Sequence, residues 1–187
     1  YKTGDLTFGL IGWQTHCLTK PNVDDRFRVV PDLLPIPTML NVMGSTGITA
    51  YYGLIELGKP KSGETVLVSG AAGATGSVVV QIAKLKGCHV IGIAGGKEKC
   101  DWLKDIGVDD VIDYKTSDVH KELPKVVKNG VDIYFDNVGG KILETVLELI
   151  NINARVLLCG GISSGYDAIR PDDGPNNLFS WIIKRAT

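Results

Sequence analysis

The stretch "VLVSGAAGATGSVVVQIAKLKG", residues 66–87, decides the fold of this chain. An apolar, β-branched run reaches Ser69, and glycines then follow at every third position, at Gly70, Gly73 and Gly76. A segment with helical periodicity comes next and ends at Gly87, where a helix often needs a left-handed residue. A strand, a glycine turn and a helix in this order are typical of sites where free backbone N–H groups and a helix dipole bind a phosphate.

The same rhythm of apolar run, turn and amphipathic segment continues over the next hundred residues. We predict strands at 65–69, 89–94, 110–113, 131–136 and 155–160, and helices at 76–86, 97–106, 119–128 and 141–150. The strands are apolar on both faces, as expected for a parallel sheet that is covered by helices on each side. The sequence therefore predicts an α/β domain with a doubly wound parallel sheet of the Rossmann type.

The flanking segments differ from this pattern. Residues 1–44 contain "GDLTFGLIGWQTHCL", which alternates like a short β segment, and a stretch punctuated by prolines, "VVPDLLPIPTML". Residues 44–57 and 176–187 are predicted to be helical. We therefore expect a β-type fragment at 1–44 and the α/β domain at 45–187, without a strand after the last helix.

Composition excludes several classes of function. The chain has 187 residues, of which 44% are hydrophobic, and a formal net charge of −1, so no basic surface for a nucleic acid is expected. It contains no apolar run of the roughly 18 residues that a membrane span needs and no signal-peptide pattern, which favours a cytoplasmic protein. No two cysteines lie within four residues of each other and the histidines stand alone, so we expect no metal site.

The glycine turn "AAGATG", 71–76, is a variant of the dinucleotide-binding pattern G-x-G-x-x-G. Ala71 takes the first glycine position, Gly73 the position of close approach to a pyrophosphate, and Gly76 the position of helix–strand packing. A glycine-rich turn without a ligand remains the alternative. A P-loop is excluded because the pattern G-x-x-x-x-G-K-[ST] is absent.

The end of the second strand favours NADP(H) over NAD. NAD sites place a carboxylate there to bind the ribose 2′-hydroxyl, but this strand ends in "AGGKEK", 94–99. Gly95 and Gly96 leave room for a 2′-phosphate, and Lys97 and Lys99 attract it. The alternative is that these lysines belong to a solvated helix start, although a helix N-terminus does not favour cations.

Further candidates follow the other strands. Tyr114, after the third strand, can stack or hydrogen-bond near an adenosine, and Asn137, after the fourth, can bind a ribose or nicotinamide or cap a turn. The segment "GISSG", 161–165, fits the G-x-S-x-G elbow of hydrolases. A hydrolase is disfavoured because "YDAIRPDDGP" follows instead of a helix and no histidine occurs after His120.

Taken in order, "GITAYYGL", "GETVLVSGAAGATGSVVVQIAKLKG", "GIAGGKEKCDWL", "DIYFDNVGG" and "LLCGGIS" resemble the medium-chain dehydrogenase/reductase superfamily. The closest resemblance is to its zinc-independent branch of prostaglandin reductases, plant alkenal double-bond reductases and curcumin-reductase-like enzymes. It implies that residues 1–44 are the end of a GroES-like substrate domain, that residues 45–187 are a Rossmann domain, and that the rest of the substrate domain and the last Rossmann strand are absent from this chain.

The resemblance also implies a set of site residues. NADP(H) would contact the pyrophosphate loop, the 2′-phosphate region and the ends of the later strands, namely Gly73, Ala74, Thr75, Gly76, Gly96, Lys99, Tyr114, Asn137, Cys159, Gly160, Gly161, Ile162 and Ser163. Relatives carry a tyrosine shortly after the CG-x-IS motif, for which Tyr166 is the nearest match as a catalytic residue. It follows "SSG", where many relatives have one residue fewer, so an ordinary loop tyrosine is the alternative.

The implied reaction is hydride transfer from NADPH to the β-carbon of an α,β-unsaturated ketone or aldehyde, with no metal. Two alternatives remain open at this point. One is a quinone reductase that uses the same cofactor, and the other is a cofactor-binding module or fragment without catalysis of its own. The resemblance further implies a small-molecule enone or enal as substrate and a homodimer.

Overall fold

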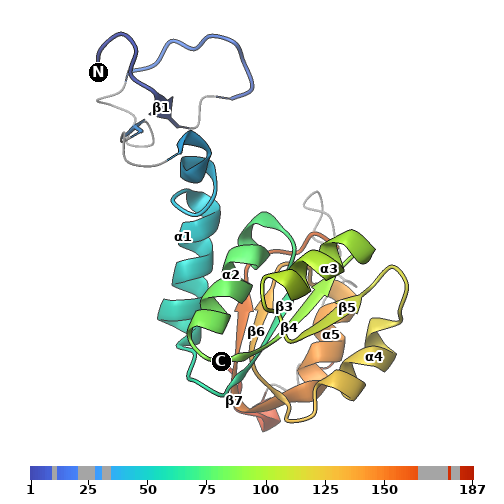
Figure 1. Cartoon of the computed structure of the whole chain (residues 1–187). Helices are drawn as coiled ribbons and strands as arrows, with labels where there is room; N and C mark the ends of the chain where they lie inside the picture. The colour runs from blue at the N-terminus through green and yellow to red at the C-terminus, as the bar shows by residue number, and fades with distance from the viewer. Residues whose placement is uncertain (10–11, 21–27, 31–34, 164–176, 178–181) are drawn as a thin grey trace.

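A parallel five-stranded sheet with helices on both faces forms the body of the computed structural model (Figure 1). The structure describes residues 1–9, 12–20, 28–30, 35–163, 177 and 182–187. The strands are β3 (Thr65–Ser69), β4 (His89–Ala94), β5 (Asp110–Asp113), β6 (Val131–Asp136) and β7 (Ile150–Leu158). Their spatial order is β5-β4-β3-β6-β7, with every neighbouring pair parallel. This confirms the predicted doubly wound sheet, whose order reverses between β3 and β6.

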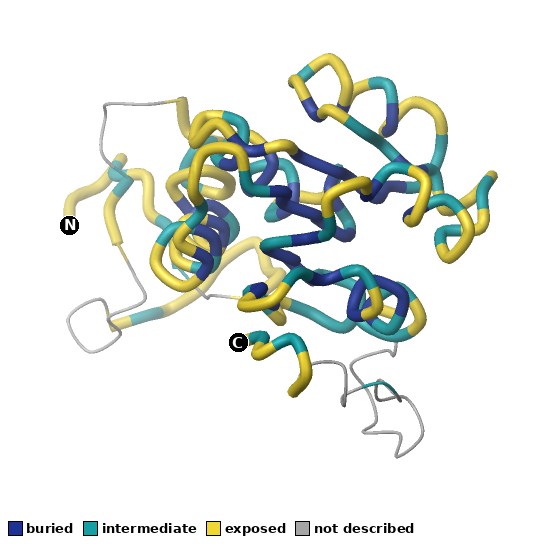
Figure 2. Tube along the Cα trace, turned by 90° about the horizontal axis from the view of Figure 1, so that it is seen from below, coloured by how far each residue is buried: buried dark blue, intermediate teal, exposed yellow. Residues whose placement is uncertain are grey.

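The helices divide between the two faces of the sheet. They are α1 (Ser45–Tyr51) with its π-helical continuation η2 (Tyr52–Gly58), α2 (Ala74–Leu85), α3 (Lys97–Asp105), α4 (Val119–Val126) and α5 (Gly140–Leu149). Buried residues of α1, η2, α2 and α3 share one core cluster with the sheet, and those of α4 and α5 share the other. Two apolar layers therefore enclose the strands, and Figure 2 shows buried residues inside and exposed ones on the outer side of the chain.

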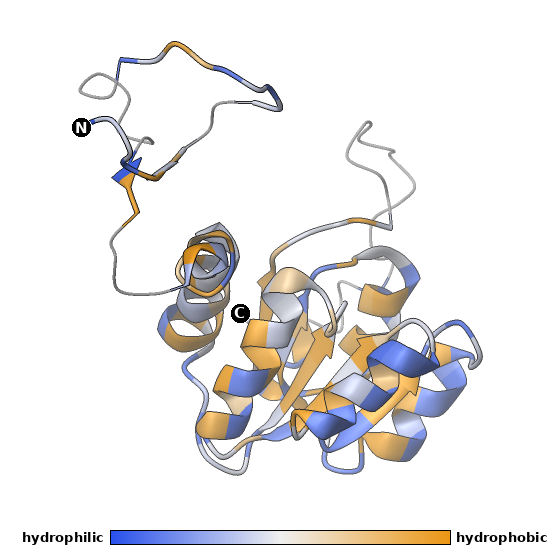
Figure 3. Cartoon of the chain, turned by 45° about the horizontal axis from the view of Figure 1, so that its top comes forward, coloured by the Kyte–Doolittle hydropathy of each residue, from blue (hydrophilic) through white to orange (hydrophobic). Residues whose placement is uncertain are grey.

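Strand β3 shows why the sequence folds in this way. All five of its residues are buried, since Val66 and Val68 pack into the cluster below α2 while Leu67 packs into the cluster below α4 and α5. A strand that buries both faces has to lie in the middle of a covered sheet. Figure 3 shows the matching pattern, with hydrophobic strands inside and hydrophilic outer faces on the helices.

Strand β7 differs from its prediction. We expected a helix to Ile150 and a strand over 155–160, but α5 ends at Leu149 and β7 begins at Ile150. Ile150 pairs with Val131, and the register then shifts before Arg155 pairs with Ile133. Asn153 in this irregular part has a left-handed backbone with φ +63°. The prediction missed the start of β7 because a bulge interrupts the alternation of apolar and polar residues on which the prediction depends.

The segment before α1 lies apart from the sheet, whereas the described end of the chain pairs with β7 (Figure 1). Strands β1 (Thr7–Phe8) and β2 (Arg28–Val29) pair antiparallel, and the 3₁₀ helix η1 (Ile36–Leu40) leads to α1 (Figure 1). Most of the helix predicted at 176–187 lies outside the described residues. Thr187 pairs with β7 through its backbone. Its carbonyl oxygen accepts the Val156 N–H at 2.7 Å, and its N–H donates to the Ala154 carbonyl oxygen at 3.0 Å. No helix among the described residues is long and apolar enough to cross a membrane.

A partly buried ion pair ties β7 to the segment before β3. Arg155 Nη1 and Nη2 lie 3.1 and 2.5 Å from the two carboxylate oxygens of Glu64, and Arg155 Nε donates to the Gly58 carbonyl at 2.9 Å. Partial burial alone would raise the pKa of Glu64, but the hydrogen bonds from Arg155 and the Lys61 N–H outweigh it and lower the pKa. Bidentate pairs of this kind are the stronger ones.

We predict that Glu64→Gln destabilises the chain in a pH-dependent way. Because the pKa of Glu64 is lower in the folded state, its stabilisation is complete above the unfolded value and disappears as pH falls through the folded one. Urea unfolding at pH 7 should show a loss of about 1–3 kcal/mol, and this difference should shrink toward pH 3. The exposed Glu56→Gln is the control and should leave stability unchanged. A loss of equal size at both pH values would contradict the prediction.

Candidate functional site

A cavity of about 370 Å³ opens at the carboxyl edge of the sheet, where the strand order reverses. Its walls come from the turn after β3, the turn after β6 and the segment after β7, namely Gly70, Gly73, Ala74, Thr75, Gly76, Asn137, Val138, Cys159, Gly160 and Ile162. Doubly wound sheets bind their ligands at such a reversal point. The volume lies within the range of about 300–1,000 Å³ that is usual for small-molecule sites.

The first turn of α2 forms one wall and can bind an anion. Gly73 precedes the helix, and its own N–H donates to the Gly70 carbonyl oxygen at 2.9 Å. The N–H groups of Ala74, Thr75 and Gly76 find no acceptor among the described residues, and all three residues line the cavity. Free N–H groups at the positive end of a helix dipole are a ready site for a phosphate.

Gly76 is required here by close packing. A Cβ at this position would lie 2.3 Å from the Gly70 carbonyl oxygen and 2.9 Å from the Ala71 Cα, so α2 approaches the end of β3 more closely than any side chain permits. Gly70 itself has a left-handed backbone with φ +60°. Ala71 takes the first glycine position of the G-x-G-x-x-G pattern, whereas the residue with a positive φ lies one position earlier.

The ends of β4 and β5 lie on the other side of β3. Tyr114 is half-exposed, and its ring covers Gly95 so closely that a Cβ there would lie 2.5 Å from the Tyr114 Cζ. Gly96 has a φ of +97° and donates its N–H to Asp113 Oδ1 at 2.8 Å. Hydrogen bonds from the Gly96 and Lys115 N–H groups lower the pKa of Asp113, so this carboxylate holds the turn between β4 and α3. None of the predicted residues Gly96, Lys99 and Tyr114 lines the cavity described above.

The two lysines after β4 differ in their partners. Lys97 Nζ forms an ion pair with Asp101 one turn along α3, and this hydrogen bond raises the pKa of Lys97. Lys99 is exposed and forms no ion pair with any described residue. Lys99 therefore remains the candidate for an anionic ligand, while much of the charge of Lys97 is compensated within the helix.

Sequence reasoning missed a buried carboxylate behind the cavity. Asp136, the last residue of β6, is completely buried, and its Oδ1 accepts hydrogen bonds from Ser69 Oγ at 2.8 Å and Tyr134 Oη at 2.7 Å. The Val138 and Gly139 N–H groups donate to the same oxygen at 3.0 and 2.9 Å. An aspartate at the end of an apolar strand was the signal available in the sequence, since such a group needs several donors to stay buried.

The structure places the remaining predicted residues around the same end of β6. Asn137 donates its Nδ2 to the Ser69 carbonyl at 2.7 Å, which agrees with the alternative of a turn-stabilising role and leaves its Oδ1 without a donor among the described residues. Partial desolvation of the thiol and the nearby Asp136 raise the pKa of Cys159, so its thiol stays protonated at neutral pH. Tyr166, the candidate catalytic residue, lies outside the described residues.

The segment after β7 packs on the turn after β6. Ser163 Oγ donates to the Val138 carbonyl oxygen at 2.6 Å and the Ser163 N–H to the same oxygen at 3.0 Å, so the serine of the G-x-S-x-G pattern is engaged in holding this turn. Gly161 belongs to the same contact, since a Cβ at Gly139 would lie 3.6 Å from its Cα. Ile162 and Gly160 line the cavity.

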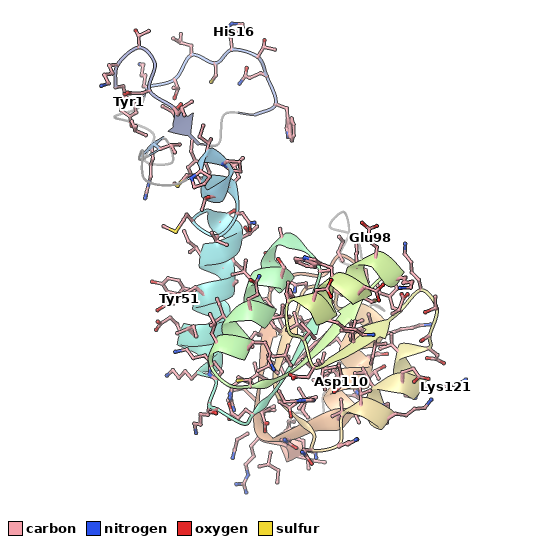
Figure 4. All side chains as sticks on the ribbon, viewed as in Figure 1. Tyr1, His16, Tyr51, Glu98, Asp110 and Lys121 are labelled. Carbon is pink, nitrogen blue, oxygen red and sulfur yellow. The ribbon has the colours of Figure 1, made fainter. Side chains whose placement is uncertain are left out.

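A second cavity, of about 300 Å³, lies at the opposite edge of the sheet beside the C-terminal turn of α4. It is lined in part by Thr65, His89 and Asp110 and contains none of the predicted site residues. Figure 4 labels Asp110 at this amino edge and Glu98, on α3, near the carboxyl edge. Within the described ranges, no group of three or more His, Cys, Asp and Glu side chains lies close enough to hold a metal ion.

Comparison with known proteins gives the family. The family model described as "Zinc-binding dehydrogenase" matches residues 74–180. The chain belongs to this family of the medium-chain dehydrogenase/reductase superfamily. The family description names zinc, but the residues that the structure describes do not gather ligands that fit this metal.

Named relatives lie in the branch that the sequence motifs indicated. The chain is 45% identical to prostaglandin reductase 1 of Oryctolagus cuniculus, over 87% of this chain and 47% of that protein. It is 41% identical to the NADP(+)-dependent 2-alkenal reductase of Nicotiana tabacum, over 99% and 54%. The crystal structure of CurA from Vibrio vulnificus in complex with NADPH matches with a TM-score of 0.76 and 46% identity, over 86% of this chain and 50% of that one. The chain spans about half the length of the curated relatives it matches.

We predict different costs for a methyl group at two glycines of this site. Gly76→Ala should destabilise the chain by about 1–3 kcal/mol, because the new methyl group meets backbone atoms that cannot move aside. Gly95→Ala is the matched control and should cost less than about 1 kcal/mol, because its methyl group meets only the end of the Tyr114 ring. Chemical denaturation of both variants measures the difference. Equal losses would contradict the packing argument.

Proposed function

We propose that this chain is the cofactor-binding part of an NADPH-dependent reductase that acts on the C=C bond of α,β-unsaturated ketones and aldehydes. The observation that carries the proposal is the cavity at the strand reversal, with the free N–H groups of residues 74–76 in its wall. The end of β4, which has no carboxylate, and Lys99, which has no ion-pair partner among the described residues, support NADP(H) as the cofactor. The CurA structure with NADPH and the reductases named above support the same cofactor and reaction.

Bound NADPH would supply a hydride to the β-carbon of the enone, after which charge moves to the carbonyl oxygen and a proton reaches the α-carbon. The residues of this chain hold the reactants for that step. The N–H groups of Ala74, Thr75 and Gly76 bind the pyrophosphate, and Lys99, beside Gly96, binds the 2′-phosphate. Tyr114 packs on the adenosine. The open Oδ1 of Asn137 accepts a hydrogen bond from the ribose or nicotinamide.

The segment after β7 completes the proposed site. Residues 159–163 cover the cofactor from the β7 side, with Cys159, Gly160 and Ile162 in the cavity wall. Tyr166 is proposed as a hydrogen-bond donor to the substrate carbonyl, on the basis of the family motif. Residues 1–44 are proposed to be part of the substrate domain and residues 45–187 the cofactor domain of a cytoplasmic homodimer.

Cofactor oxidation with two acceptors tests the reaction. The full-length protein that contains this chain is mixed with NADPH and either an enone or a quinone, with the two acceptors at equal concentration. The decrease of NADPH absorbance is then followed. Faster oxidation with the enone supports the proposal. Faster oxidation with the quinone would favour a quinone reductase, and NADPH binding without turnover of either would favour a binding module.

We predict that Lys99→Glu weakens NADPH binding roughly ten-fold or more, because a charge-assisted hydrogen bond to the 2′-phosphate is lost and a repulsion replaces it. NADH binding should change little, because NADH has no 2′-phosphate. Lys97→Glu is the matched control with a smaller effect, since the charge of Lys97 is already compensated by Asp101. Fluorescence titration with both cofactors measures this. Equal effects of the two variants on NADPH would contradict the assignment of Lys99.

A further inference from the structure

Asp136 is buried and has no cationic partner among the residues that the structure describes. It is completely inaccessible, and its hydrogen-bond donors among the described residues are hydroxyl and backbone N–H groups. A buried carboxylate that lacks an opposite charge is costly and persists only where several donors converge on it. Asp136 lies at the end of β6, beside the strand reversal, so its burial affects the turns that form the cavity.

The donors to this carboxylate come from the end of β3, from β6 and from the turn after β6. Ser69 ends β3 and donates its hydroxyl, Tyr134 donates from within β6, and the Val138 and Gly139 N–H groups donate from the turn before α5. The backbone carbonyl of Asp136 accepts the N–H groups of Cys159 and Gly160, at 2.8 and 3.1 Å. The turn after β6 and the segment after β7 are therefore both anchored at Asp136.

Ser69 connects Asp136 to Asn137 by hydrogen bonds. The Ser69 hydroxyl donates to Asp136 and accepts the Asn137 N–H at 2.9 Å, while the Ser69 carbonyl accepts Asn137 Nδ2 at 2.7 Å. The backbone N–H and the side-chain Nδ2 of Asn137 are thus held, and its Oδ1 remains without a donor among the described residues. An orientation maintained by two hydrogen bonds is preorganised for a ligand, so binding loses less side-chain entropy.

We propose that Asp136, together with Ser69 and Tyr134, is a positioning centre that sets the affinity of this crevice for the nicotinamide half of the cofactor. The inference rests on the proposed function and assigns a role to residues that do not themselves contact the ligand. In a doubly wound sheet each half binds one mononucleotide. The adenosine candidates Gly96, Lys99 and Tyr114 lie beyond β4 and β5, so the half built on β6 and β7 is left for the nicotinamide.

The hydroxyl of Tyr134 stays protonated. Burial and the neighbouring Asp136 raise the pKa of Tyr134 well above its usual value, so its hydroxyl remains a donor over the whole accessible range. Replacement by phenylalanine removes one donor and leaves the others in place, which makes Tyr134→Phe a milder test than any change of Asp136.

The test compares two ligands on matched variants of the chain. Ser69→Ala removes both the donor to Asp136 and the acceptor of the Asn137 N–H. We expect its NADPH affinity to fall roughly ten-fold, as the loss of such hydrogen bonds implies, while binding of 2′,5′-ADP, the adenosine half alone, changes less than about two-fold. Tyr134→Phe should show the same split with a smaller loss.

Thr65→Val is the control at the other end of the same strand. Thr65 is buried like Ser69, but its hydroxyl makes no hydrogen bond to a described residue, so both affinities should stay as in the wild type. Urea unfolding of all variants separates stability from binding.

The outcomes distinguish this inference from the proposed function. If the wild type binds NADPH and Ser69→Ala binds it equally well, the positioning role is wrong. If both ligands weaken together in Ser69→Ala or Tyr134→Phe, in step with the loss of stability, the residues are merely structural and the inference is again overturned. If the wild type binds neither 2′,5′-ADP nor NADPH measurably, the proposed function is wrong, and this inference is wrong with it.

Discussion

The close approach of α2 to the end of β3 is the constraint on which the rest of the crevice depends. Because Gly76 has no side chain, the first turn of the helix lies directly against the backbone of Gly70 and Ala71. This contact directs the free N–H groups of residues 74–76 into the cavity instead of leaving them at the surface of the molecule. A helix displaced outward by one methyl group would keep its dipole but would no longer present these donors at the same place.

A second constraint acts from the other side of the reversal. The buried carboxylate of Asp136 holds the end of β3 and the turn after β6, and the backbone carbonyl of the same residue holds the segment after β7. A parallel sheet brings the carboxyl ends of its strands to one edge, but it does not determine the shape of the turns that leave them. Here the turns are shaped by convergent donors on one side and by glycine packing on the other, and the cavity lies between the two.

Much of the fold was predictable from local patterns. The predictions for β3, β4, β5 and β6 agree with the structure. The inner strands β3 and β6 were the clearest, because apolar residues on both faces end at turn residues, as in Thr65–Ser69 and Val131–Asp136. The prediction failed at β7, where Asn153 adopts a left-handed backbone and a register shift interrupts the pattern. It also missed the change from α- to π-helix at Tyr52, since hydrogen-bond register within a helix leaves no mark in hydrophobic periodicity.

By itself, the sequence determined the doubly wound fold, the glycine turn between β3 and α2 and the lack of a carboxylate at the end of β4, because these depend on residue type at fixed spacing. Only the tertiary structure decided which groups are free to bind. Lys97 and Lys99 look equivalent in the sequence, yet Asp101 compensates one of them. Asn137 and Asp136 are neighbours in the chain, yet one lines the cavity and the other is buried behind it. Such differences arise from partners that lie far apart in the sequence, as Ser69 and Asp136 do, and no local pattern contains them.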